Sequence, residues 1–312
     1  MVKNKPVYAF EEADSKNRML LGGKGAGLSE MTRLRLPVPP GFTITTEVCN
    51  NYYGNGKKLP KDVMPLVMKN IAKMERKTGK KWNSTKNPLL VSVRSGAAIS
   101  MPGMMDTILN LGLNEKTVEG FAQQTKNPRF SWDSYRRFIQ LFGKVVFGVN
   151  DEKFDHVLDS AKNKQGVTDD SKLNVESLKK IVSEYKKICE THTKRKFPNT
   201  PNEQLGLAIE AVFKSWMGER AVVYREKNGI TKDIANGTAV NVVTMVFGNM
   251  GDDSATGVVF TRNGHNGKRE IEGEYLINAQ GEDVVAGVRT GKNVDLLKKE
   301  MPKSHKELSN AC

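Results

Sequence analysis

The chain contains little cysteine and no long apolar run. Its 312 residues include only three cysteines, Cys49, Cys189 and Cys312, and no C-x-x-C pair. This usage favours neither a disulfide framework nor a structural zinc site. No apolar run approaches the roughly 20 residues that cross a bilayer, and charged residues interrupt the N-terminal stretch where a signal peptide would be apolar. We expect a cytoplasmic protein without a membrane partner, with organellar targeting left open.

Acidic residues are the scarcer charged class. The chain has 49 Lys+Arg against 35 Asp+Glu, a formal net charge of +14. This excess favours a polyanionic partner, whether nucleotide, free phosphate or nucleic acid. Most of the surplus falls in two helical stretches, 57–81 and 162–196, where lysines usually form a solvated surface. Aromatic residues make up only 7% and do not interleave with these lysines, so nucleic acid is the least favoured partner.

The hydrophobic period changes along the chain and predicts four segments. Residues 1–113 alternate strands and helices, an α/β-type opening that we interpret as a first nucleotide-binding subdomain. Residues 114–198 have helical spacing and predict a lid subdomain. Residues 199–243 supply a helix and a strand that return to the first subdomain, and 244–312 predict a second, incomplete subdomain with a mixed or antiparallel sheet. The expected strands are 7–10, 42–46, 89–94, 238–247, 256–262 and 274–278, and the expected early helices follow Gly27 and span 62–77.

Two glycine-rich segments, 21–28 and 91–113, each place a cation beside permissive backbone. Such backbone indicates that something approaches the main chain closely, and a polyphosphate is the obvious candidate. Lys24 is followed by Gly25 rather than Ser or Thr, so the first segment is not a Walker A loop. Leu28 stands where a dinucleotide fingerprint needs glycine. The remaining interpretation of the first segment is an anion site, formed by a lysine just before a helix N-terminus. The alternative is that the segment is a plain tight turn.

Arg94 follows a buried strand and precedes a loop of small residues, 95–106. A guanidinium at a strand end can grip two phosphate oxygens, and the loop N–H groups could cover the same ligand. The alternative is an ion pair between Arg94 and Asp106 or another carboxylate. We interpret Met101 and its neighbouring methionines as adaptable packing.

Further candidates lie beyond this loop. Arg136 and Arg137 could reach the nucleotide from the lid, one of the two being surface charge. Carboxylates in the segment 273–290, Glu274, Glu282 and Asp283, alternate with apolar residues as on a strand or strand end, and their hard oxygens suit magnesium bound through ATP phosphates. Pairing with Arg262 or Arg289 is the alternative.

Taken together, six sequence blocks closely resemble the pyruvate, phosphate dikinase family. They are LGGKGAGL, VSVRSGAAISMPGMMDTILNLGL, SYRRFIQLF, TAVNVVTMVFGNMG, SATGVVFTR and GEYLINAQGEDVVAGVRT. The match runs from about Val7 to Arg289. The resemblance implies an α+β, ATP-grasp-like nucleotide-binding fold with an inserted helical lid subdomain, truncated at the C-terminus. It implies ATP and Mg2+ as cofactors, and ATP and inorganic phosphate as ligands.

By that resemblance, ATP and phosphate serve to phosphorylate a carrier histidine and ultimately pyruvate, giving phosphoenolpyruvate, AMP and pyrophosphate. Arg94 and Arg137 would act catalytically on the polyphosphate together with Lys24, and Glu282 and Asp283 would hold the metal. The wider nucleotide-binding set comprises Lys24, Arg94, Ser100, Met101, Gly103, Asp106, Arg137, Thr256, Glu282 and Asp283.

The chain departs from the family pattern in what it lacks. It contains no Thr-Ser-His carrier motif and no pyruvate-binding barrel, and the later strand pair that completes the family's ATP site is missing. We therefore expect part of a longer phosphotransferase, with the phosphohistidine and pyruvate-binding domains as partners and a homo-oligomeric parent. The isolated chain would be inactive in the full reaction. The alternative is a non-catalytic nucleotide-binding or regulatory module of the same fold.

Overall fold

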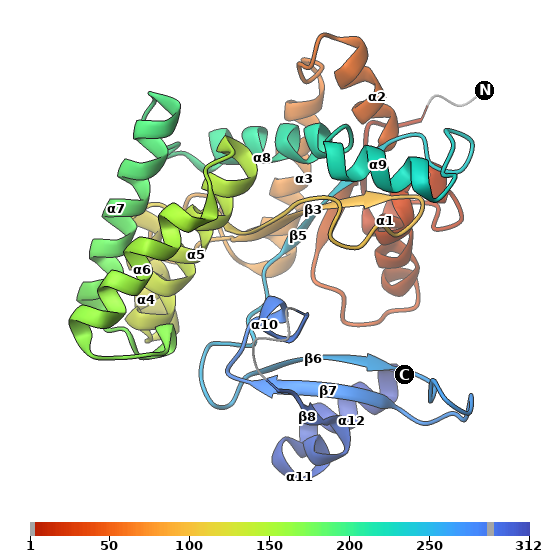
Figure 1. Cartoon of the computed structure of the whole chain (residues 1–312). Coiled ribbons are helices and arrows are strands. Elements are labelled where there is room, and N and C mark those ends of the chain that lie inside the picture. Colours follow the sequence, from red (N-terminus) through yellow and green to blue (C-terminus); the bar gives the residue numbers. More distant parts are fainter. Residues whose placement is uncertain (1–3, 286–289) are drawn as a thin grey trace. The chain divides into compact units, whose positions relative to one another are not determined.

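The computed structural model describes residues 4–285 and 290–312, apart from the side chain of Glu282. The chain divides into two compact units, Met1–Met245 and Val246–Cys312. Each unit combines helices with an antiparallel sheet, so the chain has the α+β class that we expected (Figure 1). The division into four segments stays a prediction.

The first unit contains a five-stranded sheet of order β1-β2-β5-β3-β4. Every pairing in this sheet is antiparallel, and β5, which comes late in the chain, lies between β2 and β3. The α/β-type opening that we predicted is therefore wrong about pairing, since alternation of strands and helices does not fix which strands become neighbours. The strands are β1 (Val7–Ala9), β2 (Gly41–Ile44), β3 (Val91–Ala97), β4 (Thr107–Leu111) and β5 (Thr238–Thr244).

The two faces of this sheet differ in chemistry. One face carries fully buried apolar side chains, among them Phe42, Val93 and Val242. Successive side chains of a strand point to opposite faces, so the residues next to these three, Thr43, Arg94 and Asn241, make the other face polar. Helices pack on the sheet from both sides (Figure 1). They include α1 (Arg18–Arg33), α2 (Thr46–Gly54), α3 (Val63–Thr78) and α8 (Pro201–Ser215), with the short η1 (Phe10–Glu12) and α9 (Glu219–Lys227) nearby in sequence.

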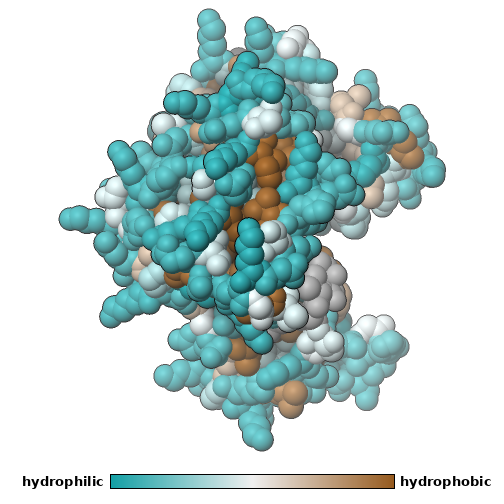
Figure 2. Space-filling model, turned by 60° about the vertical axis from the view of Figure 1, so that its left-hand side comes forward, coloured by the Kyte–Doolittle hydropathy of each residue, from teal (hydrophilic) through white to brown (hydrophobic). Residues whose placement is uncertain are grey.

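A group of helices follows β4, as the periodicity predicted. Asparagine caps begin all four of them by accepting hydrogen bonds from the first-turn N–H groups. The apolar stripe of α7, including Ile181 and Tyr185, is buried, while Lys180 and Lys187 are exposed. The outer face of these helices is mainly hydrophilic (Figure 2), in agreement with a solvated lysine surface. The helices are α4 (Glu115–Thr125), α5 (Pro128–Phe147), α6 (Asp151–Gln165) and α7 (Val175–Thr193), with the turn η2 (Asp170–Lys172).

Two predicted boundaries around the glycine-rich segments were wrong. The helix expected after Gly27 already begins at Arg18 and is interrupted at Gly22, whose φ is +69° and ψ 164°. Strand β3 continues to Ala97, so the loop expected from Ser95 starts three residues later. Glycine and small residues weaken local helix and strand signals, and tertiary packing overrides them here.

The second unit contains a three-stranded antiparallel sheet, β6-β7-β8, which confirms the strand pattern expected there. Tyr275, Val294 and Leu297 form its apolar core. The strands are β6 (Ala255–Phe260), β7 (Glu272–Ile277) and β8 (Lys292–Asn293), and the helices are α10 (Gly281–Val285), η3 (Val294–Leu296), α11 (Leu297–Glu300) and α12 (Pro302–Ala311). Within the described residues of both units, the helices are too short or too polar to span a membrane.

Candidate functional site

Lys24 and Arg94 come together on the polar face of the first sheet. Arg94 and Gly96 lie two residues apart on β3 and so point to the same side. A Cβ atom at Gly96 would lie 3.3 Å from the Cβ of Lys24, which places Lys24 directly over this strand. Both cations are solvent-exposed. The pKa of Lys24 is lowered, mainly because the surrounding protein removes part of the water around its ammonium group. The positive charge of Arg94 lowers it further. Two like charges are thus held at one surface.

The glycines of the first segment allow α1 to approach the sheet. A Cβ at Gly22 would lie 1.8 Å from the carbonyl oxygen of Gly96, and one at Gly23 would lie 3.3 Å from that of Ala98. The positive φ of Gly22 also has a strong preference for glycine. We had inferred that these glycines let a ligand reach the backbone. The structure gives them a different role, because it is the β3 backbone that occupies this space.

Two buried polar residues lie beneath α1. The Thr43 hydroxyl donates to the Asn241 Oδ1 at 2.8 Å, and a Cβ at Gly25 would meet both groups within 3 Å. Asn241 faces Arg94 in the register of β3 with β5. Its Nδ2 is buried and has no hydrogen-bond acceptor among the described residues. Such an arrangement is costly in an ordinary core and points to a polar floor under the paired cations.

The loop between β3 and β4 carries four predicted binding residues. Met101 is buried, which fits the packing role that we expected, whereas Ser100 and Gly103 are exposed. Asp106 is half-buried; burial raises its pKa, while the charges of Arg220 and Lys144 oppose the shift. The ion pair that the structure gives Asp106 is with Arg220, at 4.0 Å, and not the one with Arg94 that we considered. The loop is therefore tied to the start of α9.

Arg136 and Arg137 on α5 share one carboxylate. Asp133 accepts hydrogen bonds from Nε and Nη2 of Arg136 at 2.9 and 2.6 Å, and from Nε of Arg137 at 3.1 Å. Only 3% of the Arg136 side chain is exposed, against 24% for Arg137. The expectation that one of the pair is surface charge is wrong for Arg136, because Asp133 and Asp170 compensate its buried charge.

The remaining predicted residues lie in the second unit. Thr256 is on β6, and a Cβ at Gly281 would lie 3.7 Å from its hydroxyl oxygen. Asp283 and Glu282 belong to the short helix α10 and not to a strand or strand end as predicted, and Val284 of this helix packs with Leu276 and Ala279. The Glu282 side chain and Arg289 lie outside the described residues, whereas Arg262 donates to the Gly267 carbonyl at 3.2 Å.

Asp283 has partial ligand character for a cation. Its Oδ2 accepts the backbone N–H of Gln280 at 2.9 Å. The Gln280 side chain is 4% exposed, and its amide oxygen and nitrogen have no hydrogen-bond partner within the described part of the chain. No group of three or more His, Cys, Asp or Glu side chains suited to a metal occurs among the described residues. A carboxylate oxygen suits a hard cation, but one carboxylate is too few to hold it. Such a cation would be held mainly by the phosphate oxygens of a bound nucleotide.

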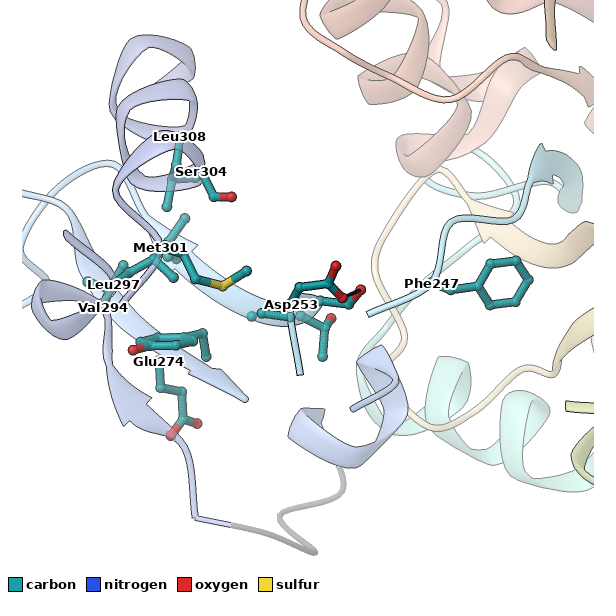
Figure 3. A pocket seen from close by; sticks show the side chains of 14 residues that line it. Phe247, Asp253, Glu274, Val294, Leu297, Met301, Ser304 and Leu308 are labelled. Carbon is teal, nitrogen blue, oxygen red and sulfur yellow. Dashed lines mark hydrogen bonds between the residues drawn. The ribbon is translucent and has the colours of Figure 1, made fainter. Parts of the chain in front are cut away.

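A pocket of about 380 Å3 lies inside the second unit. Figure 3 shows Val294, Leu297, Met301 and Leu308 on the helical side, with the Glu274 carboxylate directed away from them. Its other wall comes from β6 and β7 and includes Thr256. The lining is mainly apolar on the helical side and lacks a cation, so this pocket does not suit a polyphosphate.

Comparison with known proteins adds the family. A profile described as "Pyruvate phosphate dikinase, AMP/ATP-binding domain" matches residues 18–58 and 55–311. Pyruvate, phosphate dikinase of Entamoeba histolytica is 57% identical over 284 residues, covering 91% of this chain and 32% of the relative. The Clostridium symbiosum enzyme is 52% identical, covering 96% of this chain and 34% of the relative. The chloroplastic enzyme 1 of Arabidopsis thaliana is 48% identical over 100% of this chain and 32% of its own length.

The chain therefore belongs to the pyruvate phosphate dikinase AMP/ATP-binding domain family. It spans about a third of the length of the curated relatives that it matches.

Sequence reasoning missed several residues around the cations. Thr43 and Asn241 lie 198 positions apart, and only the insertion of β5 beside β2 brings them together. Arg220 lies on α9, a helix that we did not predict. Asp133 could have been found from the sequence, since it precedes Arg136 by three residues and Arg137 by four on an amphipathic helix.

Proposed function

We propose that this chain binds ATP, with the polyphosphate held by Lys24 and Arg94. The observation that carries the proposal is their placement at one exposed surface over β3, where nearby protein and like charge lower the Lys24 pKa. Two like charges held close together repel each other, and the negative charge of a bound polyphosphate would offset that repulsion. Arg137, on α5, would add a third contact, and residues 100–106 would cover the ligand.

The family points to the reaction in which this binding would serve. We propose that the chain is the ATP-binding part of a pyruvate, phosphate dikinase, which uses ATP and phosphate to phosphorylate a carrier histidine and then pyruvate. Positioning and charge neutralisation are the main protein contributions to phosphoryl transfer. Arg94 and Arg137 offer planar guanidinium groups that can bind two phosphate oxygens each. Lys24 offers a compact charge beside the first turn of the resumed helix.

We further propose an ATP-grasp-like arrangement in which the second unit contributes Thr256, Glu282 and Asp283. Magnesium would neutralise phosphate oxygens when bound. Asp283 would hold it together with Glu282. Gln280, whose backbone N–H donates to Asp283 and whose buried side chain has no partner among the described residues, supports a polar ligand here. The phosphohistidine and pyruvate-binding domains would be supplied by a parent enzyme. The isolated chain would not make phosphoenolpyruvate, because none of its four histidines stands in a Thr-Ser-His motif.

Calorimetry with Mg-ATP tests this proposal directly. We expect wild type to bind weakly and Arg94→Ala and Lys24→Ala to abolish measurable binding. Lys153→Ala serves as the matched control, because it removes an exposed lysine from α6, away from the sheet. Equal affinity in wild type and Arg94→Ala would reject the site. A binding-competent chain that fails to support Mg-dependent ATP/AMP exchange with the separate remainder of a parent enzyme would instead favour the non-catalytic module.

A further inference from the structure

Two adjacent arginines on α5 converge on one acidic side chain. Asp133 precedes Arg136 by three residues and Arg137 by four, the spacings at which helical side chains meet. Its two oxygens are divided between them, Oδ1 accepting from Arg136 and Oδ2 from Nε of Arg137. Arg136 is buried, so of the two guanidinium groups Arg137 is the one that can meet a ligand.

Asp133 has a second cationic partner, Arg136, besides Arg137. Burial alone would raise the pKa of Asp133, but the charges of Arg136 and Arg137 outweigh it and keep the pKa below its usual value. Asp170 adds a second carboxylate, 3.0 Å from Nη2 of Arg136 and 3.7 Å from Nη2 of Arg137. If Arg137 were the single cationic partner of Asp133, its binding to a ligand would leave the buried carboxylate unpaired. Because Arg136 also pairs with Asp133, Arg137 can bind a ligand without this cost.

The contact through Nε also fixes the orientation of Arg137. An arginine held at Nε has its last side-chain torsions restricted, so less rotamer entropy is lost when the guanidinium binds an anion. The turn that carries Asp170 is itself anchored to α5, because Arg129 donates to the carbonyls of Leu173 and Asp170 at 3.0 and 2.7 Å. The network is therefore a rigid support behind one partly exposed cation.

We infer that Asp133 is a positioning residue, which orients Arg137 for the polyphosphate while Arg136 keeps the Asp133 charge compensated. This inference rests on the proposed function, since Arg137 is assigned to the ligand there. It assigns separate roles to the two neighbouring arginines: Arg136 supports and Arg137 binds. Asp133 does not touch the ligand and acts only through Arg137.

A double-mutant cycle measured by Mg-ATP calorimetry tests the inference. We expect Asp133→Asn to weaken binding roughly threefold to tenfold, the range expected when one long side chain must be ordered on binding. In an Arg137→Ala background, the same change should alter the affinity less than twofold, because the residue through which it acts is gone. Asp170→Asn is the matched control: it removes a carboxylate from Arg136 and from Nη2 of Arg137 but leaves the Nε contact of Arg137 with Asp133, so affinity should stay within twofold of wild type.

The outcomes separate the inference from the proposed function. If Arg137→Ala binds Mg-ATP as wild type does, the proposed role of Arg137 is wrong and the inference falls with it. If Arg137→Ala weakens binding but Asp133→Asn has the same effect in both backgrounds, the proposed function survives and Asp133 is only structural. Equal losses from Asp133→Asn and Asp170→Asn would likewise overturn the positioning role.

A measurement on wild type covers the case in which Asp133→Asn does not fold. The 15N relaxation of the arginine Nε–H groups reports how far each is immobilised. We expect Arg137 Nε–H to be rigid in the protein without nucleotide, in contrast to the exposed Arg35. Equal mobility of the two groups would show that Asp133 does not hold Arg137, whatever the binding data give.

Discussion

Replacing Gly22 with alanine tests how the glycine-rich segment positions Lys24. The structure places α1 so close to β3 that a Cβ at position 22 would lie 1.8 Å from the Gly96 carbonyl oxygen and 2.6 Å from its carbon. Both atoms belong to β3, an interior strand of the sheet, and cannot move without disturbing its pairing with β5. Relief must come from displacement of α1, and Lys24 moves with it.

The expected loss of stability combines two effects. Backbone at φ +69° and ψ 164° is essentially restricted to glycine, and another residue there costs about 1–3 kcal/mol. Overpacking against rigid backbone adds about 1–3 kcal/mol. The sum, roughly 2–6 kcal/mol, is a large part of the 5–15 kcal/mol that stabilises an ordinary domain.

Denaturation followed by tryptophan fluorescence suits this comparison, because the three tryptophans, Trp82, Trp132 and Trp216, all lie in the first unit. The matched control is Gly27→Ala on the same helix, where a Cβ would meet no atom within 4 Å. That change should leave the free energy of unfolding equal or raise it by up to about 1 kcal/mol. A Gly22→Ala variant within about 0.5 kcal/mol of wild type would refute the close-approach reasoning. Where the variant folds, its Mg-ATP affinity should also fall.

Three further predictions follow from individual residues. Gly120→Ala should destabilise the first unit by about 1–3 kcal/mol in the same assay, because a Cβ there would lie 2.0 Å from a backbone carbonyl oxygen. Gly206→Ala on α8 is the control, since a Cβ there has open space and should not destabilise the unit. Equal effects of the two changes would contradict this prediction. Burial lowers the pKa of Lys186 from 10.5 to about 8, so the unfolded state binds more protons between these values. The free energy of unfolding of wild type relative to Lys186→Met should therefore rise from about pH 8 to 10.5, by up to roughly 3 kcal/mol, and a difference independent of pH would disprove the shift. Because the pKa of Lys24 is lowered, Lys24 loses its positive charge at a lower pH than an ordinary lysine, and Mg-ATP affinity should fall as pH rises through this pKa. Titration calorimetry of Lys24→Arg should not show that fall.

Sequence reasoning located the cations but not what holds them. The juxtaposition of Lys24 and Arg94 was expected from motifs, and the structure brings the two residues to one surface. The reason for the glycines was misjudged, because a sequence shows that backbone is permissive but not whether a ligand or another strand comes close to it. Pairing of distant strands decides that question, and the insertion of β5 between β2 and β3 has no local signal.

Helix boundaries and carboxylate roles show the same limit. The apolar stripes of α3 and α7 predicted these helices well, because burial of one face dominates their periodicity. The segment around Asp283 was expected as strand, since five residues are too few for a helical period to emerge. The shared use of Asp133 by two arginines depends on side-chain geometry that spacing alone leaves open.

The contact of α1 with the polar sheet face restricts how this part of the chain can vary. Gly25 sits against the Thr43–Asn241 hydrogen bond, and Gly22 against the carbonyl of Gly96. A larger side chain at either glycine requires a smaller group or a shifted strand opposite, so acceptable exchanges at these positions must occur in compensated sets. Libraries that randomise α1 while holding β2, β3 and β5 fixed will return glycine at both places, and a different residue at either position must be engineered by varying helix and strands together.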